Sequence, residues 1–137
     1  MAIYLYLYLT VGIIFLMLDA LWLTVMGTLL YKPLLGSMLQ EPFHLLPAVL
    51  FYVIYIAGIV IFAAHPAIVS GRLTTALVYG GALGFVAYAT YDLTNQATLK
   101  NWPALITVAD LAWGTVVTAA AATLGVLIVR AVTRIGV

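Results

Sequence analysis

The sequence predicts an all-α, polytopic membrane protein: a bundle of four transmembrane helices that forms a single domain over residues 1–137. The composition is 66% hydrophobic and only 7% charged, which is typical of membrane proteins and not of soluble domains. The apolar residues fall into four long runs that are separated by short polar segments. These runs take up nearly the whole length, so no room is left for a soluble domain.

The first apolar run, residues 3–30, predicts a transmembrane helix that begins with interfacial tyrosines such as Tyr4. It is longer than the ~20 residues that cross a bilayer, so tilt or protrusion is expected. It is also too long for a cleaved signal peptide and lacks a basic start, so we expect it to be retained. Tyr31-Lys32-Pro33 is predicted to end this helix, and residues 34–44 are predicted to lie along the membrane surface.

The other three spans are predicted at residues 45–64, 73–98 and 103–129. The second span is expected to end before His65-Pro66, because the residue that precedes a proline disfavours helical geometry. Residues 67–72 are then a loop. Pro103 suits the first position of the fourth helix, where a backbone N–H is not needed.

Four spans place both termini on one side of the membrane. Arg72, Arg130 and Arg134 fall on that side, and Lys32 and Lys100 fall on the other. The positive-inside rule therefore favours cytoplasmic termini, and the expected location is the inner membrane of a bacterium.

Three of the four acidic residues, Asp19, Asp92 and Asp110, fall inside predicted spans. Each costs ~3 kcal/mol there on insertion scales. Asp92 and Asp110 lie nine residues either side of Asn101, so an antiparallel hairpin places their carboxyls level, ~10–13 Å beneath the turn. Asp19 falls in the same half of the membrane. No Lys or Arg of the spans can neutralise the acids, so we expect them to share protons.

Helical spacing places small and polar residues on one face of each of the last two helices. These faces are expected to pack together, because small residues let helices approach closely in lipid. The two sets are Gly81, Gly84, Tyr88, Asp92 and Asn95, and Thr107, Asp110, Gly114, Thr118, Ala121 and Gly125.

An Asp-x-x-Trp pattern occurs twice, as Asp19-Ala20-Leu21-Trp22 and as Asp110-Leu111-Ala112-Trp113. It places an indole one helical turn from each acid. An alternative stays open, in which the acids only tie helices together through hydrogen bonds to residues such as Thr94.

Several classes of site are disfavoured. The chain has no cysteine, so disulfides and thiolate metal sites are excluded. Its net charge of +1 argues against a nucleic-acid partner. A metal site of His44 with an aspartate is geometrically conceivable but has no ligand-spacing motif, so we predict neither metal nor cofactor.

Three segments together carry a family resemblance: Leu18–Leu23, the run Tyr91-Asp92-Leu93-Thr94-Asn95-Gln96-Ala97-Thr98-Leu99, and Asp110–Gly114. With these segments the chain resembles a bacterial family of small predicted membrane proteins that is catalogued only as a domain of unknown function. The resemblance covers nearly the whole chain and implies no activity.

Three hypotheses on function remain. The first is a pocket that binds or modifies a lipid-like or amphiphilic small molecule, with membrane lipids as partners. The second is proton-coupled export by a homodimer, as in the four-helix small multidrug transporters, with Asp19 in place of their first-helix glutamate. The third is an accessory subunit of a larger membrane complex.

In the pocket hypothesis the acids Asp19, Asp92 and Asp110 are the candidate catalytic groups. Six further residues are candidates for contacting the ligand: Trp22, Tyr88, Tyr91, Thr94, Asn95 and Trp113.

Overall fold

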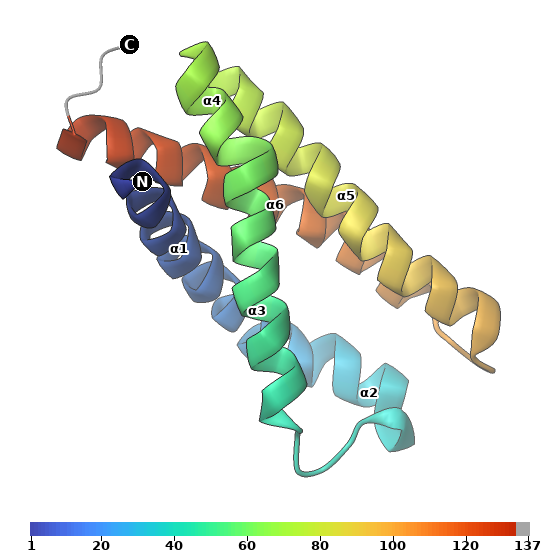
Figure 1. Ribbon diagram of the computed structural model, residues 1–137. Helices are drawn as coiled ribbons and strands as arrows, with labels where there is room; N and C mark the ends of the chain where they lie inside the picture. The colour runs from blue at the N-terminus through green and yellow to red at the C-terminus, as the bar shows by residue number, and fades with distance from the viewer. Residues whose placement is uncertain (134–137) are drawn as a thin grey trace.

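The computed structural model describes residues 1–133, and all of the regular structure in that range is helical (Figure 1). Four helical stretches are long and apolar enough to cross a membrane, which confirms the predicted all-α fold with four spans. They are Ala2–Met38, Leu45–Ser70, Leu73–Thr98 and Ala104–Thr133.

The first span is longer than predicted. Helix α1 (Ala2–Met26) passes into a π-helical turn, η1 (Gly27–Tyr31), and continues through α2 (Lys32–Leu35) to the 3₁₀ turn η2 (Gly36–Met38). The predicted helix end at Tyr31-Lys32-Pro33 was therefore wrong. The position of residues 34–44 along the membrane surface stays a prediction. Pro33 is tolerated because it lies in the first turn of α2, directly after the wide turn.

The second span repeats this arrangement. Helix α3 (Leu45–Ile59) passes through the π-helical turn η3 (Val60–Ala64) into α4 (His65–Ser70), and Pro66 lies in the first turn of α4. The predicted end at Ala64 was wrong for the same physical reason. The loop before the next helix is only Gly71 and Arg72, where Gly71 takes a left-handed φ of 70°.

The last two helices form the predicted antiparallel hairpin. Helix α5 (Leu73–Thr98) has the predicted bounds, and the chain turns through Asn101, which has a φ of 62°. Helix α6 (Ala104–Thr133) runs four residues beyond the predicted end, so Arg130 lies inside it. The predicted role of Arg134 falls outside the described residues.

Helices α5 and α6 share the most extensive interface in the structure, and glycines bring them together. A Cβ at Gly84 would stand 2.1 Å from the carbonyl oxygen of Gly114, and a Cβ at Gly114 would stand 2.2 Å from the Tyr88 ring. Gly80 is the third close contact, whereas the predicted Gly81 has ordinary van der Waals space. The backbones therefore approach closely, as small residues permit in membrane helices.

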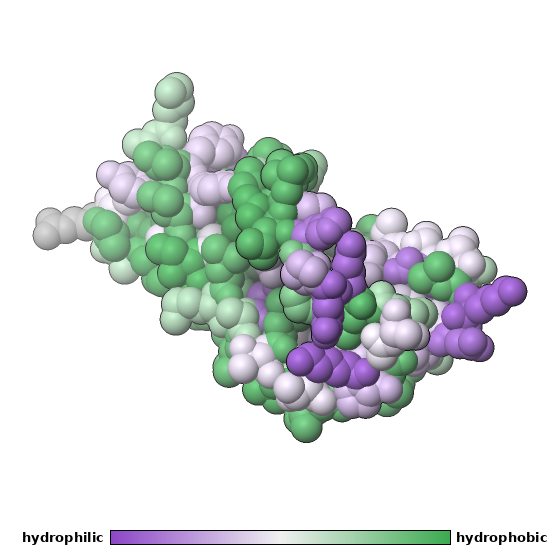
Figure 2. Space-filling model, turned by 90° about the horizontal axis from the view of Figure 1, so that it is seen from below, coloured by the Kyte–Doolittle hydropathy of each residue, from purple (hydrophilic) through white to green (hydrophobic). Residues whose placement is uncertain are grey.

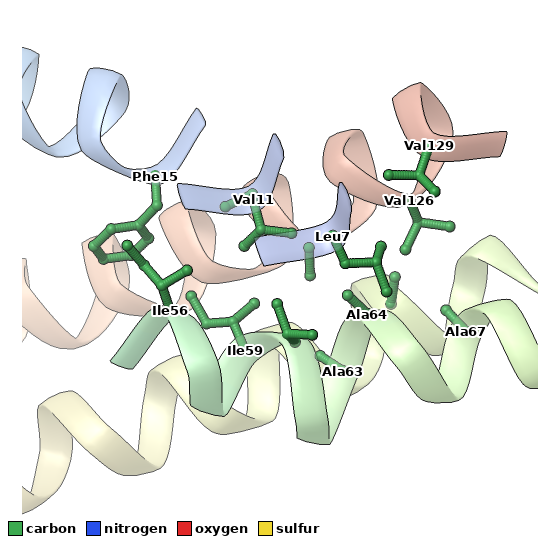
Figure 3. Packing of buried hydrophobic residues seen from close by; sticks show 14 of the residues in the cluster. Leu7, Val11, Phe15, Ile56, Ile59, Ala63, Ala64, Ala67, Val126 and Val129 are labelled. Atoms are coloured by element: carbon green, nitrogen blue, oxygen red, sulfur yellow. The ribbon is translucent and has the colours of Figure 1, made fainter. Parts of the chain in front are cut away.

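The apolar core lies in the half of the bundle nearer the termini. Leu7, Val11 and Phe15 of α1 face Ile56 and Ile59 of α3 (Figure 3). Ala63, Ala64 and Ala67 continue that face, and Val126 and Val129 of α6 lie beside it. Toward the other end, the helices enclose a cleft.

Arg130 packs the end of α4 onto α6. Its side chain is buried, and it donates a 2.8 Å hydrogen bond to the backbone carbonyl of Ala67. A cation is favourable near the C-terminus of a helix, where backbone carbonyls lack partners.

Candidate functional site

A cleft of about 1140 Å³ lies between the first span, α3 and the α5–α6 hairpin. The carboxyl groups of Asp19 and Asp110 form part of its deep wall, where these residues are only 6% and 8% exposed. Its outer part is lined by the exposed residues Lys32, Gln40 and His44. Seen from this end, one group of hydrophilic residues lies near the middle of the surface and a second lies at its right edge, while hydrophobic residues dominate the left side (Figure 2). Exposed apolar residues such as Phe43 and Leu45 also line the outer part, so the cleft is mostly apolar, with a few polar groups at its mouth and two buried acids in its wall.

Asp19 accepts two hydrogen bonds from other helices. The Tyr52 hydroxyl of α3 donates to its Oδ2 at 2.6 Å, and the Trp113 indole of α6 donates to its Oδ1 at 3.2 Å. Asp19 therefore ties α1 to both neighbours. Bonds of this kind are expected from the helix-tying alternative as well as from a site.

Asp110 accepts a short hydrogen bond from the Tyr31 hydroxyl. Tyr31 lies at the end of η1, so the helical path through the π-turn brings its side chain to the cleft. The Trp22 indole donates in turn to the Tyr31 oxygen at 2.9 Å. Asp110 is thereby connected to the first span through a chain of two donors.

The tryptophan of each Asp-x-x-Trp segment is hydrogen-bonded, directly or through Tyr31, to the aspartate of the other segment. Trp113, from the segment that holds Asp110, donates to Asp19. Trp22, from the segment that holds Asp19, reaches Asp110 through Tyr31. The two indole rings stack with centroids 4.4 Å apart and planes 5° apart. Each indole therefore contributes to the hydrogen bonding of the aspartate on the facing helix and not of the aspartate one turn away on its own helix.

Asp92 lies beside Asp110 on the α5–α6 interface and is fully buried. Neither of its carboxyl oxygens has a hydrogen-bond partner. It does not line the cleft, whereas Asp110 does. The structure thus brings the level acids of the hairpin together, but only Asp19 and Asp110 face the cleft.

The predicted ligand-contacting residues divide into two groups. Tyr88 and Tyr91 line the cleft together with both indoles. Thr94 is exposed and its hydroxyl bonds back to the carbonyl of Thr90, and Asn95 also lies off the cleft wall. A threonine in a helix readily bonds to its own preceding turn, and the ligand contacts of Thr94 and Asn95 stay predictions.

Two tyrosines that contact the acids were not predicted as site residues. Tyr52 lies seven residues after the start of its span, near the depth of the acids. That depth was a usable signal for Tyr52. No signal was available for Tyr31, because Lys32-Pro33 indicated that the helix ended there.

Within residues 1–133, no group of three or more His, Asp or Glu side chains has the arrangement of a metal site. His44, the candidate partner of an aspartate, lies instead 3.1 Å from the Gln40 amide nitrogen. The side chains that meet at the acids carry carboxyl, phenol and indole groups.

Residues 4–127 match the family described as "Predicted membrane protein (DUF2177)". The chain belongs to this family. As a DUF2177 member with four candidate spans, it is a multi-pass membrane protein. Neither the comparison with curated proteins nor the comparison with solved structures gave a match. The three aspartates, both indoles and both acid-bound tyrosines fall inside the segment that matches DUF2177, whereas Arg130 falls beyond it.

Proposed function

We propose that this protein binds a lipid-like or amphiphilic small molecule in the cleft, in a bacterial inner membrane with cytoplasmic termini. The observation that carries the proposal is a cleft of about 1140 Å³ with two carboxyls in its deep wall and aromatic rings beside them. This volume exceeds that of most sites for drug-sized ligands, which are ~300–1,000 Å³. The polar end of the ligand meets Asp19 and Asp110, and its apolar part lies against Trp22, Trp113 and Tyr88.

The depth of the acids supports an amphiphile as the ligand. Asp92 lies six residues before the end of α5, and Asp110 six residues after the start of α6. Both are thus ~9 Å from the helix ends at 1.5 Å per residue. Helix α5, with 26 residues, spans ~39 Å and exceeds the ~30 Å hydrocarbon core. The acids therefore lie just inside the hydrocarbon boundary, where the polar and apolar parts of an amphiphile meet.

The pair Asp92 and Asp110 also supports acid–base chemistry on a bound molecule. General acid–base catalysis by two carboxyls works best when their environments differ. Asp110 faces the cleft and accepts a bond from Tyr31, whereas Asp92 is fully buried beside it without a partner. Asp110 is then the group that touches the ligand.

Native mass spectrometry of the detergent-purified protein tests the binding proposal. Wild type is expected to retain an amphiphile, and Asp110→Asn is expected to lose it at an unchanged unfolding temperature, because the amide keeps the volume and an acceptor for Tyr31. Glu41→Gln is the matched control, since Glu41 is exposed and lies off the cleft. A wild type without any bound molecule, or equal retention in Asp110→Asn, would contradict the proposal.

The two other hypotheses predict different outcomes. Proton-coupled export predicts that a strain with Asp19→Asn becomes sensitive to cationic drugs, while no amphiphile co-purifies with wild type. An accessory subunit predicts that the native mass includes a partner chain and that Asp→Asn changes reduce its capture.

A further inference from the structure

We propose that the polar group which the cleft accepts is an ammonium group, so that the ligand is a cationic or zwitterionic amphiphile. This inference rests on the proposed function and names its ligand class. The shared chemistry is a primary or quaternary ammonium on an apolar chain.

Four hydrogen-bond donors around the acids are already used. The hydroxyl of Tyr52 and the indole of Trp113 donate to Asp19. The hydroxyl of Tyr31 donates to Asp110, and the Trp22 indole donates to Tyr31. The deep wall therefore offers carboxylate acceptors with lone pairs to spare and no free indole or phenol donor from these four residues. A ligand group that bonds to an ionised carboxylate of this wall must itself be a donor.

The charge of the cluster also calls for a cation. The side chains that interact electrostatically or by hydrogen bonds with Asp92 and Asp110 are other acids and a tyrosine, and none of them is a cation. The four described spans contain Lys32, which is exposed in the outer part of the cleft, and Arg130, which bonds to the Ala67 carbonyl. No hydrogen bond or ion pair in the described structure joins either of them to the acids. A buried carboxylate is costly unless it is paired, so these acids need either protons or a bound cation.

Asp92 adds a further buried acid to the cluster. It is fully buried, it lies beside Asp110, and both its oxygens lack hydrogen-bond partners. Buried carboxyl oxygens are rarely left unpaired in a protein without a functional reason. An ammonium bound at Asp110 pairs that carboxylate directly, and Asp92 then needs only a proton of its own to be neutral.

The aromatic rings in the cleft also suit an ammonium group. The stacked rings of Trp22 and Trp113 and the ring of Tyr88 line the cleft near the acids. Ammonium groups are attracted to such faces, and aromatic sites for quaternary ammonium are an established use of this attraction. A phosphate on the same molecule would meet Lys32 and His44 in the outer part of the cleft.

Two pairs of probes, titrated into the purified full-length protein and followed by native mass spectrometry, test this inference. Hexadecylamine is compared with hexadecanol, and phosphatidylethanolamine with phosphatidylglycerol of the same acyl chains. Wild type is expected to bind at least one ammonium probe about tenfold more tightly than its matched counterpart, since hydrogen bonds to charged groups contribute about that much. Preference in the first pair indicates a single-chain amine, and preference in the second indicates a phospholipid headgroup.

Asp19→Asn and Asp110→Asn are each expected to lower the affinity for the ammonium probe about tenfold and to leave the affinity for hexadecanol unchanged. Glu41→Gln is expected to behave as wild type. Equal binding of the ammonium and matched probes by wild type would overturn this inference while the proposed function stands. Binding of no probe by wild type, with no co-purified molecule, would overturn both. The wild-type comparison decides the question even if a variant fails to fold.

Discussion

The hydroxyl of Tyr31 donates a hydrogen bond to Asp110, a residue 79 positions further along the chain. This bond depends on the π-helical turn η1, which continues the first helix past the point where Lys32-Pro33 was expected to end it. The same bond connects the first span to the hairpin of α5 and α6 beside the cleft. Single-turn π-helical segments often occur at functional sites, and this one positions a residue that contacts the candidate site.

Tyr31→Phe is expected to lower the free energy of unfolding by about 1 kcal/mol, because the buried Asp110 oxygen loses its donor and Trp22 loses its acceptor. Reversible unfolding in mixed micelles measures this change. Tyr79→Phe is the matched control, since Tyr79 is exposed on α5. Equal stability of the two variants would contradict the role given to Tyr31.

Gly84→Ala and Gly114→Ala are each expected to destabilise the α5–α6 hairpin by about 1–3 kcal/mol or more, because the new Cβ overlaps atoms that cannot easily move. Gly58→Ala is the control. It lies inside α3 with nothing within 4 Å of the added Cβ, and alanine is the better helix former there. If Gly58→Ala is as harmful as the two interface variants, the close approach of α5 and α6 is not the cause.

The acids are expected to differ in their effect on stability. Asp19→Ala removes the acceptor for Tyr52 and Trp113, whereas Asp92→Ala breaks no hydrogen bond. Asp19→Ala is therefore expected to be less stable than Asp92→Ala by about 1–3 kcal/mol. Both variants lose the same atoms, so the comparison cancels most of the packing loss. A larger loss for Asp92→Ala would mean that Asp92 has a structural partner in the membrane.

Much of the fold follows from composition and from the spacing of polar segments. Four apolar runs and the turn at Asn101 were enough to predict the hairpin of α5 and α6 and the bounds of α5. The helix ends at Pro33 and Pro66 were predicted wrongly, because a proline is compatible with the first turn of a helix that restarts after a π-turn. A rule that considers only the residues next to a proline cannot predict such a turn, because tertiary contacts favour it.

The site was predictable only in part. The counting of residues from Asn101 placed Asp92 and Asp110 at one level, since a straight helical hairpin has a fixed rise per residue. Which side of a helix faces a cleft depends on how four helices pack together. The sequence therefore did not distinguish the buried Asp92 from the cleft-facing Asp19. It also did not indicate that Trp113 bonds to Asp19 and that Trp22 bonds to the tyrosine that contacts Asp110.

The orientation in the membrane remains a prediction. Arg72 and Arg130 lie at one end of the spans, and Lys32 and Lys100 lie at the other. Reporter fusions are expected to place the C-terminus in the cytoplasm. A periplasmic C-terminus would reverse which leaflet supplies the ligand and would leave the helical fold unchanged.

Photolabelling tests most directly whether the cleft is where an amphiphile binds. A single-chain probe that carries a diazirine beside its polar group is bound to the purified protein and irradiated, and the labelled peptides are mapped by mass spectrometry. We predict adducts on cleft residues such as Phe51 and Trp113, which are lost in Asp110→Asn and kept in Glu41→Gln. Adducts confined to the outer apolar groove of α5 and α6, which Leu77, Val78 and Val116 line, would contradict the account.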